Sequence, residues 1–218
     1  MSSSRDLAAR IRRRADRAGV VIPGEALASL AAYLEVLGKW NRKINLTAFS
    51  MEKPSEEAID RLVLEPVAAS KHVRRADLLA IDLGSGGGSP GLPLAIAVPH
   101  LRMVLVEVKT RKAVFLREAI RVLGLEERLE VENRRFEELL ASVELNQAAD
   151  LVTFRAVRAD ANLWASVGDL LQPAGRVFWF GGIPTAVLPP FEIVVREGLV
   201  QSRGAHLTIL RRSSLSAG

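Results

Sequence analysis

Residues 80–96 read AIDLGSGGGSPGLPLAI, and this stretch decides the fold. It begins with a short apolar run that is typical of a buried strand and ends at Leu83. Three glycines follow at alternate positions, Gly84, Gly86 and Gly88. Glycine permits positive φ and lets a ligand approach the backbone closely, and Pro90 suits the first position of a helix. The order strand, glycine turn and helix therefore predicts a ligand crevice at the carboxyl end of the first strand of an open α/β sheet.

The rest of the chain after residue 75 alternates β-type runs with helical stretches. We expect strands at residues 78–83, 103–106, 129–131, 150–154, 176–180, 192–195 and 207–210, and helices at 91–98, 111–123, 136–141 and 161–171. This alternation predicts a Rossmann-like α/β fold, with a mostly parallel seven-stranded sheet and helices on both faces. The last two runs have no clear helix between them, which predicts an antiparallel hairpin at one edge.

Residues 1–75 are expected to form a helical extension ahead of a ligand-binding domain at 76–218. Apolar residues recur at helical spacing in two separate segments of this extension. A further helix pair is expected at residues 55–73, where Pro66 would bend it or open its second half. Trp40 lies between helices, and we expect it to pack in the core rather than stack on a base.

The pattern of the glycine loop discriminates between ligands. The dinucleotide pattern G-x-G-x-x-G requires a third glycine where this chain has Ser89, which disfavours a nicotinamide-dependent oxidoreductase. S-adenosylmethionine has no pyrophosphate and instead needs close backbone packing. Glu107 follows the second strand, where an acid can accept hydrogen bonds from ribose hydroxyls. Asp82 is a carboxylate in a strand buried on both faces, where one seldom lies without a partner. We therefore expect an S-adenosylmethionine site, the alternative being a structural turn with a surface glutamate.

The composition is that of a globular protein with a basic excess. Lys and Arg number 30 against 25 Asp and Glu, and there is no cysteine, which excludes disulfides and thiolate metal sites. No segment resembles a signal peptide or a membrane span, so we expect a cytoplasmic protein without membrane or metal partners. Basic residues beside the crevice are predicted to contact a polyanion: Lys109, Arg111, Lys112, Arg117 and Arg135. The arginines at residues 10–17 either bind phosphates or form a solvated face.

Several motifs resemble those of one family, the bacterial small-subunit rRNA guanine-N7 methyltransferases, also called glucose-inhibited division protein B. The glycine loop with its Pro-Gly-Leu-Pro continuation is similar to the family's loop. KWNRKINLT at residues 39–47 resembles its Trp-Asn…Asn-Leu-Thr signature, and VEVKTRKAVFL at 106–116 resembles its second-strand segment. NRRFEEL at 133–139 and FRAV at 154–157 are similar to two further family segments. The resemblance covers most of the chain.

The resemblance implies a reaction, a partner and particular site residues. It implies methyl transfer from S-adenosylmethionine to N7 of a guanine in 16S ribosomal RNA, either in the RNA itself or in the assembled small subunit. We expect the protein to act as a monomer. The resemblance also implies cofactor contacts at Gly84, Ser89, Phe136, Glu137 and Arg155. Arg155 would anchor the cofactor or the guanine and so assist catalysis by positioning, and a salt bridge from Arg155 to Asp82 or Asp150 would be compatible with that role.

Two positions depart from the family pattern. Leu62 stands where the family has a histidine, and Gly181 stands where it has a lysine. Two alternatives therefore stay open, a diverged member that methylates another RNA and a non-catalytic RNA-binding assembly factor. Guanine N7 is an unprotonated lone pair in the major groove, so its methylation needs no general base. The chain, with three histidines, contains no obvious catalytic triad.

Overall fold

The computed structural model describes residues 4–141, 144–157, 160–181, 190–200 and 206–212. Its helices are α1 (Ser4–Ala18), α2 (Ala26–Asn41), α3 (Glu56–Ile59), α4 (Glu65–Ala69), α5 (Gly91–Ala97), α6 (Thr110–Leu123) and α7 (Ala161–Leu170). A π-helical turn (Asp60–Leu64) joins α3 to α4, and 3₁₀ turns cover Ser70–His72 and Phe136–Ala141. Its strands are β1 (Leu79–Leu83), β2 (Arg102–Val106), β3 (Leu129–Glu132), β4 (Ala149–Arg155), β5 (Leu171–Phe180), β6 (Phe191–Gly198) and β7 (His206–Arg212).

The strands form one seven-stranded sheet in the order β3-β2-β1-β4-β5-β7-β6. The first five strands in this order, β3, β2, β1, β4 and β5, run parallel to one another, whereas β7 is antiparallel to both β5 and β6. The predicted Rossmann-like sheet and its closing hairpin are therefore confirmed. Successive strands are added on one side of β1 up to β3 and on its other side from β4 onward, so the strand order reverses between β1 and β4. The carboxyl ends of these two strands therefore border the crevice at which such sheets bind ligands.

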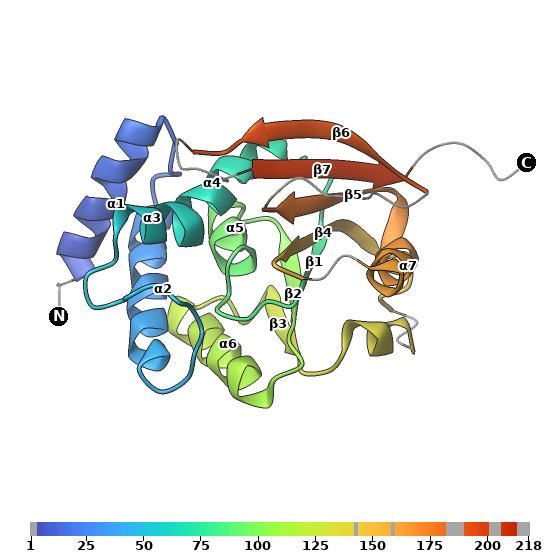
Figure 1. Cartoon of the computed structure of the whole chain (residues 1–218), viewed down its shortest axis with the longest axis horizontal. Coiled ribbons are helices and arrows are strands. Elements are labelled where there is room, and N and C mark those ends of the chain that lie inside the picture. Colours follow the sequence, from blue (N-terminus) through green and yellow to red (C-terminus); the bar gives the residue numbers. More distant parts are fainter. Residues whose placement is uncertain (1–3, 142–143, 158–159, 182–189, 201–205, 213–218) are drawn as a thin grey trace, which may run out of the picture.

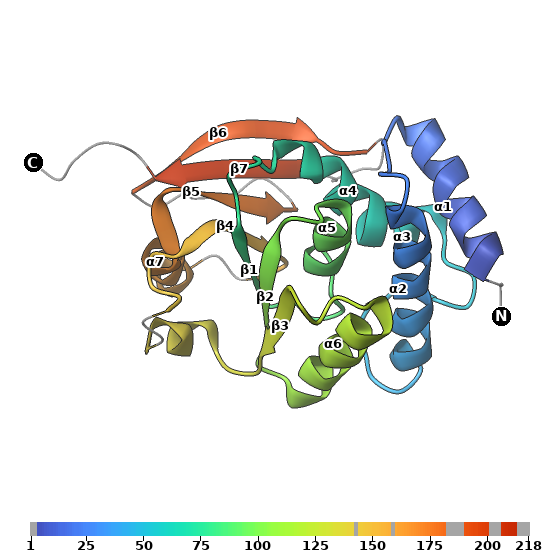
Figure 2. The same cartoon turned by 180° about the vertical axis from the view of Figure 1, so that it is seen from behind.

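Each face of the sheet has its own hydrophobic core. Helices α1 to α6 lie on one side and α7 on the other (Figure 1, and from behind in Figure 2). Strand β1 supplies both cores by alternation, because Ala80 packs in the larger core while Ile81 and Leu83 pack in the core beneath α7. Successive side chains of a strand point to opposite faces, so Asp82 points toward the same face as Ala80, where α5 covers the sheet.

Arginine side chains of α1 bond to the segment at residues 54–60, which contains α3. Arg14 donates two hydrogen bonds to the buried carboxylate of Asp60, at 2.9 and 2.6 Å. Arg17 forms an exposed ion pair with Glu56 at 2.5 Å, and Arg10 donates to the carbonyl oxygen of Pro54. Arg10 and Arg14 therefore bond within the chain, whereas Arg12, Arg13 and Arg17 are exposed, as expected for a solvated face. Phosphate binding by this helix stays a prediction. Trp40 packs edge-on against Phe115, as expected for a core residue.

Local details differ from the sequence expectations at three places. The helix pair at residues 55–73 is interrupted by the π-helical turn, although Pro66 opens its second half, α4, as one of the two expectations had it, at a position where its missing N–H costs little. Residues 136–141 form a 3₁₀ helix rather than an α-helix. Pro90 is the N-cap of α5 instead of its first residue.

Within the described residues, no helix has the length and apolar character required to cross a membrane.

Candidate functional site

The glycine loop between β1 and α5 is fastened to the end of β2. Gly84, Gly86 and Gly88 have φ values of +70°, +54° and +88°, which only glycine adopts readily. The backbone N–H groups of Gly84 and Ser85 donate to the carbonyl of Val106 at 2.9 and 3.0 Å. The loop therefore takes its shape from left-handed glycines and from bonds to the neighbouring strand.

Glu107, the first residue after β2, also bonds to the glycine loop. One of its carboxylate oxygens accepts a hydrogen bond from the Gly86 N–H at 2.9 Å, and the other accepts one from the Lys109 N–H at 2.7 Å. Only 6% of its surface is exposed. Each carboxylate oxygen carries a second acceptor position, so the group can still accept hydrogen bonds from a ligand.

The N-terminal extension supports the loop from behind. The hydroxyl of Tyr33, a fully buried residue of α2, donates to the carbonyl of Gly87 at 2.8 Å. The carbonyl oxygen of Leu46 would lie only 3.0 Å from a Cβ at Gly87, so that side of the loop is closely packed. Asn41 in turn accepts hydrogen bonds from the N–H groups of Leu46 and Thr47 at 2.9 and 3.0 Å. The KWNRKINLT segment therefore packs against the glycine loop at Gly87, and Asn41 fixes the backbone of the residues that make this contact.

Asp82 lies beneath the loop and is fully buried. Its carboxylate accepts a hydrogen bond of 2.6 Å from Thr153, the residue opposite it in the register of β4. Burial raises its pKa to about 6, although the Thr153 and Ser85 hydroxyls and the Arg155 charge act to lower it. Because no surface of Asp82 is exposed, the carboxylate organises the loop rather than facing the crevice.

A cavity of about 200 Å³ opens beside the loop at the carboxyl ends of β1 and β2. Its lining residues are Gly84, Val106, Glu107, Val108, Arg134, Arg135, Phe136, Glu137 and Val157. The structure thus brings together Gly84, Glu107, Phe136 and Glu137, four of the residues predicted to bind the cofactor. Asp82, Gly86, Gly88, Ser89 and Arg155 do not line it. The cavity thus combines exposed glycine backbone, a carboxylate that can accept hydrogen bonds, and apolar side chains. These groups fit the ribose and the base of a nucleoside.

Arg155 lies at the end of β4, near Ser89 of the glycine loop. Its Nη2 forms an ion pair of 2.7 Å with Glu65, and its Nη1 donates to the carbonyl of Arg61 and lies 3.5 Å from Ser89 Oγ. The partners suggested by the sequence, Asp82 and Asp150, are therefore wrong, because Asp82 bonds to Thr153 and Asp150 accepts backbone N–H groups.

Burial sets the ionisation of this pair. Burial lowers the pKa of Arg155 to about 10, even though the Glu65 charge raises it, so the guanidinium stays charged at neutral pH. Burial also raises the pKa of Glu65, against the lowering effect of Arg155 and Arg61.

A basic groove of about 550 Å³ lies between the KWNRKINLT segment and the start of α6. It is lined by Asn41, Arg42, Lys43, Ile44, Asn45, Lys109, Thr110, Arg111 and Lys112. Three predicted polyanion contacts, Lys109, Arg111 and Lys112, thus lie beside two basic residues that were not predicted. Of the other two, Arg117 lies outside the groove and donates to the carbonyl of Val131, and Arg135 lines the cavity beside the glycine loop.

Sequence reasoning missed several residues that shape the site. Tyr33 is the only tyrosine of the chain, but nothing in its helix indicates a contact with residue 87. Thr153 could have been found, because it is a polar residue in a buried strand that pairs with the strand of Asp82. Glu65 had one signal, its place in a segment that resembles the family's, but its partner is 90 positions away.

The fold resembles those of solved methyltransferases. An O-methyltransferase from Klebsiella pneumoniae matches with a TM-score of 0.61 at 12% identity, over 98% of this chain and all of that one. The mitomycin 7-O-methyltransferase matches with a TM-score of 0.59 at 15% identity, over 97% of this chain and 69% of that one. With its glycine loop and the acid after β2, the chain is a Rossmann-like class I methyltransferase whose cofactor is S-adenosylmethionine.

The sequence comparisons identify the family. Residues 26–186 match the family model of rRNA small subunit methyltransferase G. The protein of that name from Xanthomonas axonopodis pv. citri is 38% identical over 194 residues, covering 85% of this chain and 86% of the relative. The one from Stenotrophomonas maltophilia (strain K279a) is 39% identical over 156 residues, covering 71% and 68%. The chain belongs to the rRNA small subunit methyltransferase G family.

The raised pKa of Asp82 predicts a pH-dependent contribution to stability. A carboxyl group whose pKa rises from 3.8 to about 6 on folding favours the folded state most below pH 4, and this contribution is lost as the pH rises through 6. Asp82→Asn cannot ionise and keeps its shape. At roughly 1.36 kcal/mol per pKa unit, its unfolding free energy relative to the parent should therefore increase by up to about 3 kcal/mol between pH 4 and pH 7. Urea unfolding at both pH values measures this difference, and a constant difference would contradict the assignment.

Proposed function

We propose that this chain transfers a methyl group from S-adenosylmethionine to N7 of a guanine in small-subunit (16S) ribosomal RNA. Membership of the family supports the reaction and the substrate. The observation that carries the proposal is the cavity beside the glycine loop, where Glu107 and Phe136 face a common space at the carboxyl end of the sheet. The site therefore offers groups for the cofactor next to an open edge where a base can enter.

The cofactor roles follow from position. Glu107 would accept hydrogen bonds from the ribose hydroxyls, and Phe136 with Glu137 would flank the adenine. The loop residues Gly84, Gly86, Gly88 and Ser89 would allow the cofactor to lie close to the backbone. Asp82 would act indirectly, by holding the base of the loop through Thr153.

The proposed methyl transfer requires no general acid or base from the protein. The bound cofactor supplies an electrophilic methyl group on a sulfonium ion, and guanine N7 offers a lone pair without a proton to remove. The residues of the chain then have to align the two reactants, and alignment alone can contribute several kcal/mol to catalysis. Among the described residues there is no cluster of three or more acids or histidines that could hold a metal ion.

The basic groove is the proposed RNA-binding surface. Lys109, Arg111 and Lys112 from α6 and its N-cap face Arg42 and Lys43 across the groove. Arginine and lysine bind phosphates and release counterions, which makes affinity salt-dependent. Arg117 and Arg135 remain predicted contacts at the edges. We propose that the protein acts as a monomer in the cytoplasm, on the RNA or the assembled subunit, with residues 1–75 as a helical support for the domain at 76–218.

A non-catalytic RNA-binding assembly factor is the second candidate. Leu62, at the position of the family histidine, is 93% covered by apolar core. A leucine there cannot hydrogen-bond a base, so this observation favours a role without catalysis.

Methyl transfer to small ribosomal subunits that lack the modification tests the proposed function. With labelled S-adenosylmethionine, we expect label in N7-methylguanine after digestion of the rRNA. Gly86→Val, which places a β-branched residue at φ +54° in the loop, should abolish incorporation. Binding of subunits without any label would favour the assembly factor, and label in protein or small molecules alone would refute the proposal.

Replacing Glu107 tests the ribose contact. Hydrogen bonds to a charged group contribute roughly 1.5–3 kcal/mol, and about 1.4 kcal/mol corresponds to a tenfold change in affinity. Glu107→Ala should therefore weaken S-adenosylmethionine binding by roughly 10- to 100-fold in calorimetry. The control is Glu118→Ala, which removes a glutamate of α6 that pairs with Arg121 on the surface. A loss below about threefold for Glu107→Ala would exclude the contact.

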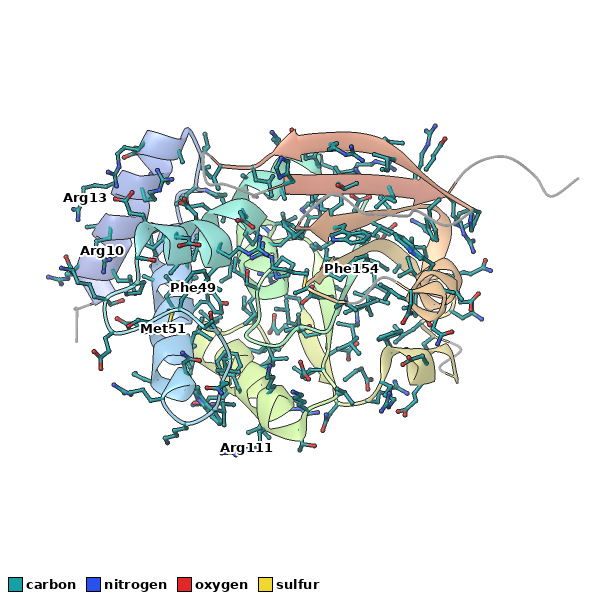
Figure 3. The ribbon with its side chains drawn as sticks, in the orientation of Figure 1. Arg10, Arg13, Phe49, Met51, Arg111 and Phe154 are labelled. Carbon is teal, nitrogen blue, oxygen red and sulfur yellow. The ribbon has the colours of Figure 1, made fainter. Side chains whose placement is uncertain are left out.

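The groove predicts a change in the salt dependence of RNA binding. Removing Arg42 and Arg111 together should lower the slope of log affinity against log salt by about 1 to 2, because each phosphate contact contributes about 0.7 to 0.9. Cofactor affinity should stay nearly the same. Arg12→Ala with Arg13→Ala removes the same charge from the exposed face of α1, away from Arg111 (Figure 3). Equal slopes for the two double variants would contradict the assignment of the groove.

A further inference from the structure

A cavity of about 520 Å³ lies between α1, α2 and the chain that leads to α3. Its apolar lining consists of the half-buried Met51 and the buried side chains of Leu7, Leu34 and Pro54. Figure 3 shows Met51 beside α2, where a Cβ at Gly38 would lie 3.2 Å from the Cβ of Met51. Ligand pockets in proteins have volumes of roughly 300–1,000 Å³ and mostly apolar linings, so this cavity has the size and the surface of a binding site.

Four charged side chains also line this cavity, and they bond to none of the residues that the structure describes. They are Glu35, Lys39, Arg42 and Glu52. Glu35 and Lys39 have the i,i+4 spacing at which oppositely charged side chains pair on a helix, yet they form no ion pair. Glu35 is half-buried, so its carboxylate faces the cavity with its acceptor positions free for a ligand.

The cavity adjoins the basic groove, because Asn41 and Arg42 line both. The groove also adjoins the cavity beside the glycine loop, since the N–H of Lys109 in the groove donates to the carboxylate of Glu107 in that cavity. An RNA strand that lies in the groove therefore has the proposed methyl donor at one end and the 520 Å³ cavity at the other.

The charges indicate what the groove and this cavity can each bind. Five basic residues and no acidic residue line the groove, which suits phosphates. In the cavity, Glu35 and Glu52 balance the two basic side chains, and two carboxylates would repel a phosphate. An uncharged group with apolar faces and polar edges fits such a lining, and an unpaired nucleobase is a group of this kind.

We propose that this cavity binds an unpaired nucleobase of the substrate RNA while the neighbouring phosphates lie in the basic groove. Met51 and the apolar side chains contact the face of the base, as a thioether does with other aromatic rings. Glu35 accepts a hydrogen bond from the amino group that adenine, cytosine and guanine carry. The inference rests on the RNA binding of the proposed function and adds recognition of a base other than the methylated guanine.

Removal of the Glu35 carboxylate distinguishes a bound base from a bound phosphate. Glu35→Ala should weaken the binding of small-subunit rRNA about tenfold and leave the slope of log affinity against log salt unchanged, because no phosphate contact is lost. If the cavity held a phosphate or no RNA at all, the loss of a negative charge would strengthen binding or leave it unchanged. Either of these results would overturn the proposal.

The control for this variant is Glu25→Ala. Glu25 is an exposed residue at the N-cap of α2, at the end of the helix opposite Asn41. Its replacement removes the same charge and should not weaken RNA binding. Equal losses of affinity in Glu25→Ala and Glu35→Ala would contradict the assignment of the cavity.

A single thiol reports directly on occupancy, because the chain has no cysteine. Ser50→Cys places a thiol at an exposed lining residue of the cavity, and Val21→Cys places one ahead of α2 on a residue that is 87% exposed. N-ethylmaleimide alkylates both, and mass spectrometry follows the reaction. Saturating naked 16S rRNA should slow alkylation of Ser50→Cys at least fivefold and that of Val21→Cys less than twofold.

The alkylated proteins test whether the cavity contributes to affinity. N-ethylmaleimide attached to Ser50→Cys occupies part of the cavity, so we expect RNA binding to weaken at least tenfold. The Kd for S-adenosylmethionine should stay within threefold of the parent value. Alkylated Val21→Cys should bind both ligands as the parent protein does.

The thiol experiment separates the nucleobase from other occupants. A thiol of Ser50→Cys that reacts freely in the saturated RNA complex would overturn the proposal. Protection by assembled small subunits alone, without protection by naked rRNA, would assign the cavity to a ribosomal protein and would also overturn it.

Failure of this inference is distinguishable from failure of the proposed function. Methyl transfer to rRNA together with an unprotected thiol would refute the base site alone. Protection by rRNA without methyl transfer would refute the proposed reaction and leave the base site standing. A protein that binds neither rRNA nor small subunits would refute both.

Discussion

The carboxylate of Glu107 accepts hydrogen bonds from two backbone N–H groups, those of Gly86 and Lys109, and the rest of the site depends on this arrangement. Gly86 belongs to the loop after β1 and Lys109 is the N-cap of α6, so one side chain joins the turns that follow two adjacent strands. Parallel pairing of β1 with β2 ends at Leu83 and Val106, directly before these turns. Without the carboxylate, the loop and the start of α6 would each present an unpaired N–H at the edge of the cavity.

A second constraint is that buried charges need partners. The interior of the described structure holds three arginine–carboxylate pairs, formed by Arg14 with Asp60, Arg155 with Glu65, and Arg176 with Asp77. The first two meet at the π-helical turn, so the N-terminal helix α1 is connected through buried ion pairs to the carboxyl end of β4. The helical extension thus contributes twice to the site, once through this connection and once through the Tyr33 hydroxyl behind the glycine loop.

Much of the sheet and of the cofactor side of the site could be predicted from the sequence, because those signals are local. Apolar runs separated by helical stretches predicted each strand, and the glycines with Glu107 predicted the crevice. The Asp82–Thr153 contact was also within reach, since two polar residues in buried parallel strands need each other. The remaining features depend on contacts distant in sequence. Nothing near Arg155 indicates Glu65 as its partner, and nothing near Arg42 indicates that it lies across a groove from Arg111.

The structure of the protein crystallised with S-adenosylhomocysteine tests the central claim most directly. The account predicts electron density in the cavity beside the glycine loop, with the ribose hydroxyls within hydrogen-bonding distance of Glu107 and the adenine against Phe136. The Gly86 N–H should still donate to Glu107 in that complex. Density for the nucleoside at any other place, or a ribose that does not contact Glu107, would contradict the account.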